Sequence, residues 1–271
     1  MRRSLDSGIR LAVFDWAGTL VDHGGLAHVE AMIAAFETVG VCVSAAQVRW
    51  ATRGRVREQI EHLLRVPHIL RAFERAHGHS PRERDRETIY RSLQAAQHSA
   101  IERHATLIDG ALGCIGYMRE RGIAITTITD CEPTAHELLV ARAAAQGLNP
   151  DYCASCEAPV AGGSEPFQIL SCMERFGIKR PREVLLVAGA ARQIEASGHV
   201  GCISVGVASS GEEVGLSGQA FAQLELREQN ALLAHAHRSL REVHASFVVD
   251  TMLELPLVLE RLAQRRLSPA A

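Results

Sequence analysis

Short apolar runs alternate with stretches of helical periodicity along much of this 271-residue chain. Apolar runs of four to seven residues are typical of strands that are buried on both faces of a parallel sheet. The runs with this character are residues 11–14, 123–129, 184–188 and 203–207. Helical patterns between the later runs indicate helices that cover the sheet. The pattern therefore predicts an α/β fold with a Rossmann-like core, in which helices lie on both faces of a parallel sheet.

The first two apolar runs are separated by about a hundred residues, far more than a βαβ connection requires. Helical periodicity fills much of this gap, in residues 29–39, 56–64 and 69–76. We therefore expect a helical cap, residues 24–104, inserted after the first strand. Residues 1–23 and 105–271 would form the core, and the glycine-containing segments 24–25 and 108–110 would be the hinges.

Composition narrows the classes of partner and compartment. The formal net charge of −2 gives no electrostatic reason to expect nucleic acid or a membrane surface as a partner. The sequence has no apolar run long enough to span a bilayer, and residues 1–10 lack a signal-peptide core. Seven cysteines in a chain of this length do not indicate a disulfide framework. We expect a cytoplasmic protein that binds neither nucleic acid nor membranes.

The spacing Cys153-x-x-Cys156 has two interpretations. It is half of a zinc site if two further ligands lie nearby, and His136 and Cys131 are available. Because the sequence offers no clear second pair at metal-ligand spacing, we favour the interpretation that these are two reduced cysteines near a strand end.

Candidate chemistry is concentrated after the first strand, where Asp15 begins the string Asp15-x-x-Gly18-Thr19-Leu-Val-Asp22. Sites form at the carboxyl ends of strands in open α/β sheets, and a carboxylate there can attack a bound electrophile. A single aspartate at this place is more often a turn residue, but the whole string resembles the nucleophile motif of the haloacid dehalogenase superfamily. The form Asp-Trp-Ala-Gly-Thr resembles the phosphonoacetaldehyde hydrolases in particular, and the resemblance extends over about residues 11–262.

The resemblance implies a mechanism with several parts. In that family, a cap lysine forms a Schiff base with the aldehyde, and the core aspartate accepts the phosphoryl group. Two carboxylates hold magnesium, and an arginine and a hydroxyl hold the phosphonate. The resemblance assigns catalytic roles to Asp15, Thr19 and Thr129 and substrate contacts to Ala17 and Gly18.

Several of these parts are missing from the chain. Alignment of the cap with the family puts Val56 at the Schiff-base lysine and Gln59 at a neighbouring histidine. Lys179 is the only lysine among 29 Lys and Arg residues, and it lies in a polar connector before a core strand. An arginine cannot replace the lysine, because it stays protonated and is not a nucleophile.

The third and fourth motifs are also altered. Gly163 stands at the arginine position, and Gly189 and Gln193 stand at the two carboxylate positions. Asp130 follows Thr129 and puts a negative charge where a phosphonate would lie. Magnesium usually needs carboxylate ligands. We therefore expect no metal site and no cofactor, although the family uses magnesium.

Arg53, Arg55 and Arg57 form a dense basic cluster in the expected cap. The first interpretation is a solvated surface, as for most charge runs. The alternative is a clamp that binds the anionic group of a substrate.

These observations predict a diverged, phosphonoacetaldehyde hydrolase-like protein that has lost the standard mechanism. It would be non-catalytic, or it would use altered, metal-independent chemistry on a small anionic molecule. There are two alternatives. The first is a hydrolase with an aspartate nucleophile and no metal, as in haloacid dehalogenases, in which Arg192 or the cap arginines hold the substrate carboxylate. The second is phosphonoacetaldehyde hydrolysis itself. The resemblance also implies a possible homodimer formed through the cap.

Overall fold

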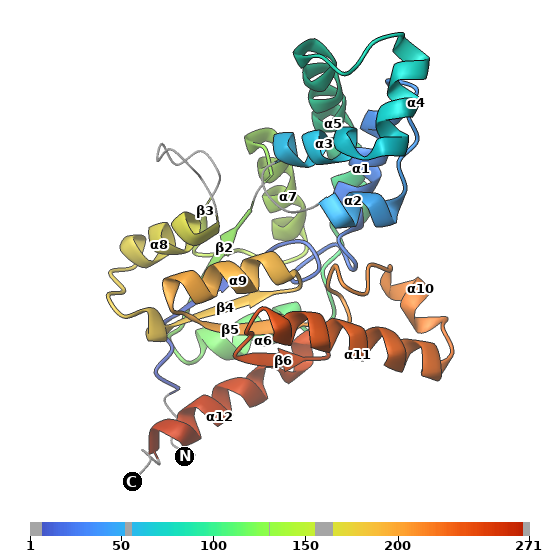
Figure 1. Ribbon diagram of the computed structural model, residues 1–271. Helices are drawn as coiled ribbons and strands as arrows, with labels where there is room; N and C mark the ends of the chain where they lie inside the picture. The colour runs from blue at the N-terminus through green and yellow to red at the C-terminus, as the bar shows by residue number, and fades with distance from the viewer. Residues whose placement is uncertain (1–6, 52–55, 130, 155–164, 268–271) are drawn as a thin grey trace.

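The computed structural model of the chain describes residues 7–51, 56–129, 131–154 and 165–267. Within these residues, six parallel strands form one sheet in the order β3-β2-β1-β4-β5-β6 (Figure 1). The strands are β1 (Leu11–Phe14), β2 (Ala124–Ile128), β3 (Tyr152–Ala154), β4 (Val184–Ala188), β5 (Ile203–Val207) and β6 (Phe247–Val249). The α/β fold with a Rossmann-like core, predicted from the alternation of apolar runs and helical patterns, is confirmed.

The central strand β1 is completely buried, because β2 and β4 flank it and helices cover both of its faces. Its side chains alternate between two apolar clusters: Leu11 and Val13 belong to one, and Ala12 and Phe14 to the other. This alternation explains why the strand reads as a continuous apolar run.

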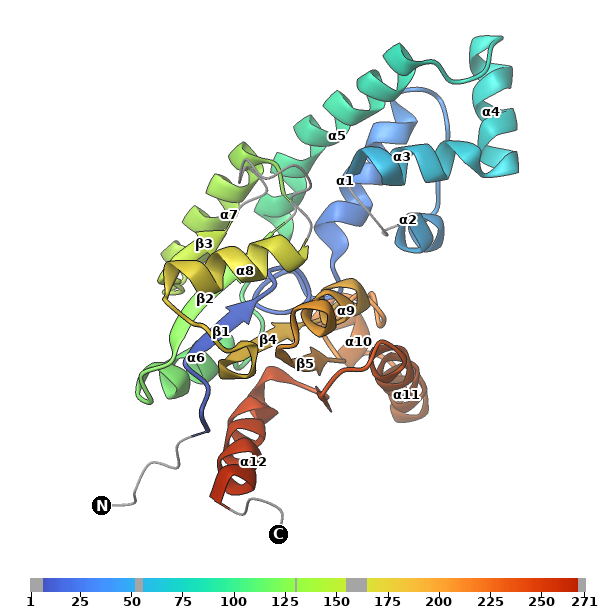
Figure 2. The ribbon, with the colours of Figure 1, turned by 60° about the vertical axis from the view of Figure 1, so that its left-hand side comes forward.

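Helices form a layer on each side of the sheet (Figure 2). The cluster around Leu11 is covered by α8 (Glu165–Arg175), α9 (Ala191–Val200) and α11 (Leu226–Glu242). The opposite face is covered by α6 (Ala111–Arg119), α7 (Pro133–Ala145) and α12 (Leu255–Leu267). The remaining short elements are α10 (Gly218–Ala222) and the 3-10 helices η1 (Pro181–Glu183) and η2 (Met252–Glu254).

Of the six helices described between β1 and β2 in the sequence, the first five gather beyond the carboxyl ends of these strands (Figures 1 and 2). We call them the helical insertion: α1 (Leu26–Glu37), α2 (Ala45–Ala51), α3 (Val56–Arg65), α4 (Pro67–His77) and α5 (Glu83–His104). The long helices α1 and α5 pack along each other and bury side chains such as Phe36 and Leu93. Helix α2 has no counterpart in the periodicity analysis, because only Val48 and Ala51 are buried in it. In the described part of the chain, no helix is both long and apolar enough to cross a membrane.

Two chain segments connect the helical insertion to the sheet, and they run side by side. Val21 forms an antiparallel bridge with Leu107, and the Ile108 N–H donates to the Leu20 carbonyl at 2.9 Å. Gly24 has a φ of 90°, and its N–H donates to the Ser210 carbonyl at 2.7 Å. A β-carbon on Gly24 would lie 2.3 Å from the Leu216 carbonyl oxygen, so a side chain does not fit there. The first connection is therefore seated on a loop that follows β5.

Candidate functional site

A cavity of about 90 Å³ lies between the helical insertion and the carboxyl ends of β1 and β2. Its core side is formed by the residues after β1 and β2 and by the start of α9. Its other side is formed by α1, α3 and α5. This arrangement agrees with the general placement of ligand sites at the carboxyl ends of parallel strands.

Asp15 and Thr129 both line this cavity, because they follow neighbouring parallel strands. Asp15 is buried, and its N–H extends the sheet by donating to the Val187 carbonyl at 3.0 Å. Thr129 exchanges two hydrogen bonds with Gln168: its N–H donates to Oε1 at 3.0 Å, and its carbonyl accepts from Nε2 at 2.9 Å. Ala17 also lines the cavity. The structure thus brings together three of the residues that the sequence assigned to a site.

Gly18 and Thr19 do not line the cavity but lie beneath it, at a junction of three loops. The Thr19 hydroxyl oxygen accepts from the Gly189 N–H, and Ser210 donates from its hydroxyl to the Gly18 carbonyl, each at 2.8 Å. The Gly189 carbonyl accepts from the Glu212 N–H at 3.0 Å. These bonds join the loops after β1, β4 and β5, so Gly18 and Thr19 shape the site from below.

The residues at this junction do not fit the magnesium ion that the sequence resemblance implies. A β-carbon on Gly189 would lie 2.4 Å from the Gly18 carbonyl oxygen and 2.9 Å from the Gly211 Cα, so backbone fills the space of a side chain. Gln193 is buried, and an amide supplies a weaker ligand than a carboxylate. Among the described residues, no group of three or more His, Cys, Asp and Glu side chains is placed to hold a metal. At position 189, backbone therefore occupies the space that a metal-binding side chain would need.

The insertion contributes Val56 and Gln59 to the cavity, the two residues aligned with the family's lysine and histidine. The Gln59 Oε1 atom lies 2.7 Å from Nε2 of His28, which also lines the cavity. Lys179 is exposed in the connector that precedes β4, at the amino end of the sheet. Because β4 is parallel to β1, this is the end opposite Asp15.

An arginine and a glutamate form an ion pair in the cavity wall. Arg192, at the start of α9, lies with its Nη1 atom 3.5 Å from the Glu212 Oε1 atom, and both residues line the cavity. Gln97 reaches in from α5, and its Nε2 atom donates to the Cys131 Sγ atom at 3.9 Å. Glu212, Gln97 and His28 belong to no sequence motif, and each comes from a different loop or helix, so the local sequence gives no signal for them.

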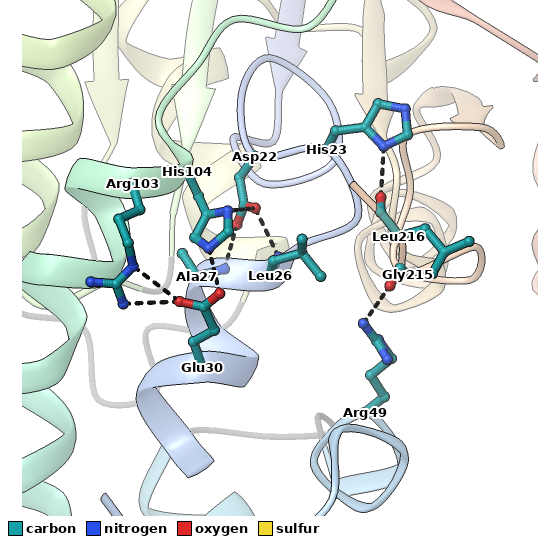
Figure 3. A network of polar contacts seen from close by, with 10 residues as sticks. All are labelled: Asp22, His23, Leu26, Ala27, Glu30, Arg49, Arg103, His104, Gly215 and Leu216. Atoms are coloured by element: carbon teal, nitrogen blue, oxygen red, sulfur yellow. Dashed lines mark hydrogen bonds and ion pairs between the residues drawn. The ribbon is translucent and has the colours of Figure 1, made fainter. Parts of the chain in front are cut away.

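Asp22 is also buried in this wall, where it fixes the start of α1 (Figure 3). Its two carboxylate oxygens accept from the N–H groups of Leu26 at 2.8 Å and Ala27 at 3.0 Å. Burial raises the pKa of Asp22 to about 6, although these hydrogen bonds and His104 act in the opposite direction. The motif contained Asp22, but its burial depends on the helices that pack over it.

His104 connects Asp22 to the outer surface of the insertion (Figure 3). Its Nδ1 atom lies 3.9 Å from Asp22 Oδ1, and its Nε2 atom lies 2.8 Å from Glu30 Oε1. Arg103 also pairs with Glu30, at 2.9 Å. The pKa of the Glu30 carboxyl is lowered because these two partners outweigh its partial burial. The network ties the end of α5 to the start of α1.

The basic cluster of the insertion is described only at Arg57, because Arg53 and Arg55 lie outside the described residues. Arg57 pairs with Glu87 on α5 at 2.7 Å, and its guanidinium lies 3.9 Å from the centre of the Tyr90 ring. It is exposed and does not line the cavity. These contacts fit a surface pair between α3 and α5 rather than an anion clamp.

The Cys153-x-x-Cys156 pair is described only at its first member, because Cys156 lies outside the described residues. Cys153 lies in β3 and is partly buried, and burial raises the pKa of its thiol. Gly163 and Asp130, two other positions singled out in the sequence, also lie outside the described residues.

The sequence of the chain is similar to those of known hydrolases. Residues 9–198 match the family model of the haloacid dehalogenase-like hydrolases. A phosphonoacetaldehyde hydrolase from Nitratidesulfovibrio vulgaris is 28% identical over 263 residues, covering 97% of this chain and 94% of the relative. A phosphonoacetaldehyde hydrolase from Vibrio cholerae is 27% identical over 266 residues, covering 97% and 98% of the two chains.

Solved structures show the same fold. A phosphonoacetaldehyde hydrolase-like protein from Oleispira antarctica aligns over 100% of this chain and 98% of its own, with a TM-score of 0.91 and 24% identity. A beta-phosphoglucomutase from Clostridium difficile aligns over 96% and 99%, with a TM-score of 0.65 and 14% identity. At these identities the likeness shows the fold alone.

Proposed function

Because the chain belongs to the haloacid dehalogenase-like hydrolases, we propose that the cavity beside Asp15 binds a small molecule without the imine and magnesium chemistry of phosphonoacetaldehyde hydrolysis. The observation that carries this proposal is Val56 in the cavity wall, together with backbone that fills the space beside Gly189. The chain is thus a diverged member of the family, either a binding protein or an enzyme of altered chemistry.

Imine formation needs a primary amine that reaches the substrate. Val56 offers an apolar side chain at the position aligned with the lysine. Lys179 is exposed at the opposite end of the sheet, so it does not reach a molecule beside Asp15. Without an iminium, the aldehyde carbonyl itself would have to accept the electron pair of the carbon–phosphorus bond, and a neutral carbonyl is a weaker electron sink.

A phosphonate dianion would also meet unfavourable charge. It would lie near the Asp15 carboxylate, and like charges at close range repel strongly in a site that excludes water. Arg192 is the described lining residue with a permanent positive charge, and Glu212 already pairs with it. One paired guanidinium does not replace an arginine, a lysine and a metal ion.

In this proposal the helical insertion, residues 24–104, acts as a cap over a core of residues 1–23 and 105–271. The cavity lies between the two parts, so a ligand would enter when they separate and be enclosed when they close. A homodimer formed through the cap stays a prediction from the family resemblance.

The first experiment measures turnover of phosphonoacetaldehyde with and without magnesium, beside the Vibrio cholerae relative as positive control. We expect no release of phosphate and, after borohydride treatment, no adduct by mass spectrometry. Magnesium-dependent turnover, or a reduced adduct on Lys179 that requires Asp15, would contradict the proposal.

A second candidate is a metal-independent hydrolase in which Asp15 attacks carbon, and Arg192 in the cavity wall favours it. The Asp15 carboxylate would displace a halide from a 2-haloacid whose own carboxylate pairs with Arg192, and an ester would form. Water would then attack the carbonyl carbon of that ester, which regenerates Asp15 and releases the 2-hydroxyacid and a proton. The side chain, not the product, would retain one oxygen atom from water.

This candidate is tested by halide release from a panel of 2-haloacids. With excess protein in ¹⁸O-labelled water, one turnover should place the label on Asp15, and Asp15→Asn should release no halide. Halide release that persists in Asp15→Asn would exclude this mechanism. The Arg57→Gln variant is the control. Arg57 lies outside the cavity wall, so its substitution should leave turnover unchanged.

A further inference from the structure

An unpaired hydrogen-bond acceptor lies in the wall of the cavity. Among the described residues, the Gln97 Oε1 atom has no hydrogen-bond partner, although the side chain is only 5% exposed. The Nε2 atom of the same amide is held by Cys131, so the amide spans from α5 to the loop after β2. A buried acceptor without a donor is costly, and it marks a place where a bound molecule can donate.

The described residues that line the cavity carry more carboxylates than guanidinium groups. Of the described lining residues, Asp15, Asp22 and Glu212 carry carboxylates and Arg192 carries the guanidinium. The imidazoles of His28 and His104 also lie in the wall, where Gln59 contacts the first and Asp22 and Glu30 contact the second. Because charges attract and repel more strongly in a partly enclosed site than in bulk water, an excess of carboxylates favours a positively charged guest over an anion.

The rest of the wall is apolar. Val56 on α3, Ile101 on α5 and Leu139 on α7 supply aliphatic side chains to it. Such surface fits the carbon skeleton of a small organic molecule better than a hydrated metal ion.

From the unpaired Gln97 oxygen, the surplus of carboxylates and the apolar wall, we propose that the cavity binds a small organic cation, a primary ammonium on a short branched hydrocarbon body. The ammonium donates hydrogen bonds to Gln97 Oε1 and pairs with the Asp15 carboxylate, while the hydrocarbon contacts Val56 and its apolar neighbours. The inference rests on the proposed role of the cavity as a small-molecule site and adds the chemical class of its ligand.

The test compares three probes on one carbon skeleton by titration calorimetry at neutral pH: isobutylamine, 2-methylpropan-1-ol and 2-methylpropanoate. We expect the amine to bind at least about tenfold more tightly than the alcohol, and the carboxylate to bind most weakly. Tighter binding of the carboxylate, or equal binding of amine and alcohol, would overturn the inference.

Two variants on α5 make the test specific. Gln97→Leu removes the acceptor, so it should weaken amine binding about tenfold or more. The same change should raise the melting temperature of the protein without ligand, because a buried unpaired oxygen is replaced by hydrocarbon. Gln94→Leu is the matched control: it makes the same change on the same helix outside the cavity wall and should leave amine affinity unchanged.

Opposite shifts of affinity and stability are a result that a merely structural role for Gln97 would not give. If Gln97→Leu leaves amine affinity unchanged, the inference is wrong. Failure of this inference can be distinguished from failure of the proposed function. If the alcohol or the carboxylate binds best and phosphonoacetaldehyde is not turned over, only the assignment of a cationic ligand is wrong. If phosphonoacetaldehyde is turned over, the proposed function itself is wrong.

Discussion

The hydroxyl oxygen of Thr19 accepts a hydrogen bond from the backbone N–H of Gly189 at 2.8 Å. The bond joins the loop after β1 to the loop after β4, and both groups are buried. Because solvent does not reach this place, the Gly189 N–H depends on Thr19 for its partner.

Thr19→Val should therefore lower the free energy of unfolding by about 1–3 kcal/mol, because it leaves the Gly189 N–H without an acceptor. Thr19→Ser keeps the hydroxyl and loses only a methyl group, so its cost should be smaller, about 1 kcal/mol. Chemical denaturation of both variants measures the difference. If valine were tolerated as well as serine, the bond would not have the proposed importance.

Gly189→Ala tests the packing at the same junction. A β-carbon there meets the Gly18 carbonyl oxygen and Gly211, so the loops must move apart, at a cost of about 1–3 kcal/mol or more. Gly198→Ala is the control, since a β-carbon on this exposed position of α9 meets no atom within 4 Å. That variant should gain up to about 1 kcal/mol from its better helix propensity. A neutral Gly189→Ala would contradict the packing argument.

Restoration of the family carboxylates should likewise fail to create a metal site. The double variant Gly189→Asp with Gln193→Asp needs space that backbone already fills. We expect a less stable protein with no magnesium binding by calorimetry. Tight magnesium binding by this variant would show that the junction opens readily.

Asp22 should give a measurable pH dependence of stability. Burial raises its pKa in the folded protein to about 6, above the ordinary value of 3.8. The folded state therefore holds this proton more tightly, so the contribution to stability is full below about pH 4 and is lost as the pH rises through 6. Each unit of difference corresponds to about 1.4 kcal/mol, so the loss is on the order of 2–3 kcal/mol.

Asp22→Asn removes this titration. The difference in unfolding free energy between variant and wild type should shift in favour of the variant as the pH rises from 4 to 7. A constant offset is expected as well, since Asn retains only one oxygen for the N–H groups of Leu26 and Ala27. A difference that does not vary with pH would mean that Asp22 titrates normally.

Arg49 should help to hold the helical insertion against the sheet. Its Nη2 atom donates from α2 to the carbonyl oxygen of Gly215 at 2.6 Å, in the loop after β5 (Figure 3). Arg49→Met should speed amide hydrogen exchange in α2 and around Gly215, because the lost charged hydrogen bond is worth about 1.5–3 kcal/mol. Arg65→Met, which removes an exposed pair with Glu61, should have little effect. Equal exchange in the two variants would exclude the role of Arg49.

The local sequence was sufficient to predict the buried strands and the helices that have a clear apolar stripe. A strand buried on both faces must be apolar at every position, which is why residues 11–14, 184–188 and 203–207 could be located. The length between the first two strands required an insertion, and its periodicity identified α1, α3 and α4. Helix α2 was missed because its two buried residues form no recognisable stripe. Asp15 and Thr129 were found for a related reason, since both follow strands.

The composition of the cavity wall could not be found in this way. Gln97, His28 and Glu212 lie in separate helices and loops, and packing of the insertion over the sheet brings them to the same cavity as Asp15.

The sequence by itself determined the sheet, the insertion and the carboxylate at the end of β1. It also determined that Lys179 is the only lysine of the chain. Only the tertiary structure decided that Gly189 has no room for a carboxylate, that Asp22 is buried, and that the Gln97 oxygen in the cavity wall has no partner among the described residues. The physical reason is that periodicity and spacing report which face of an element is buried. Close approach between residues that are far apart in the chain, such as Thr19 and Gly189, exists only once the elements have packed.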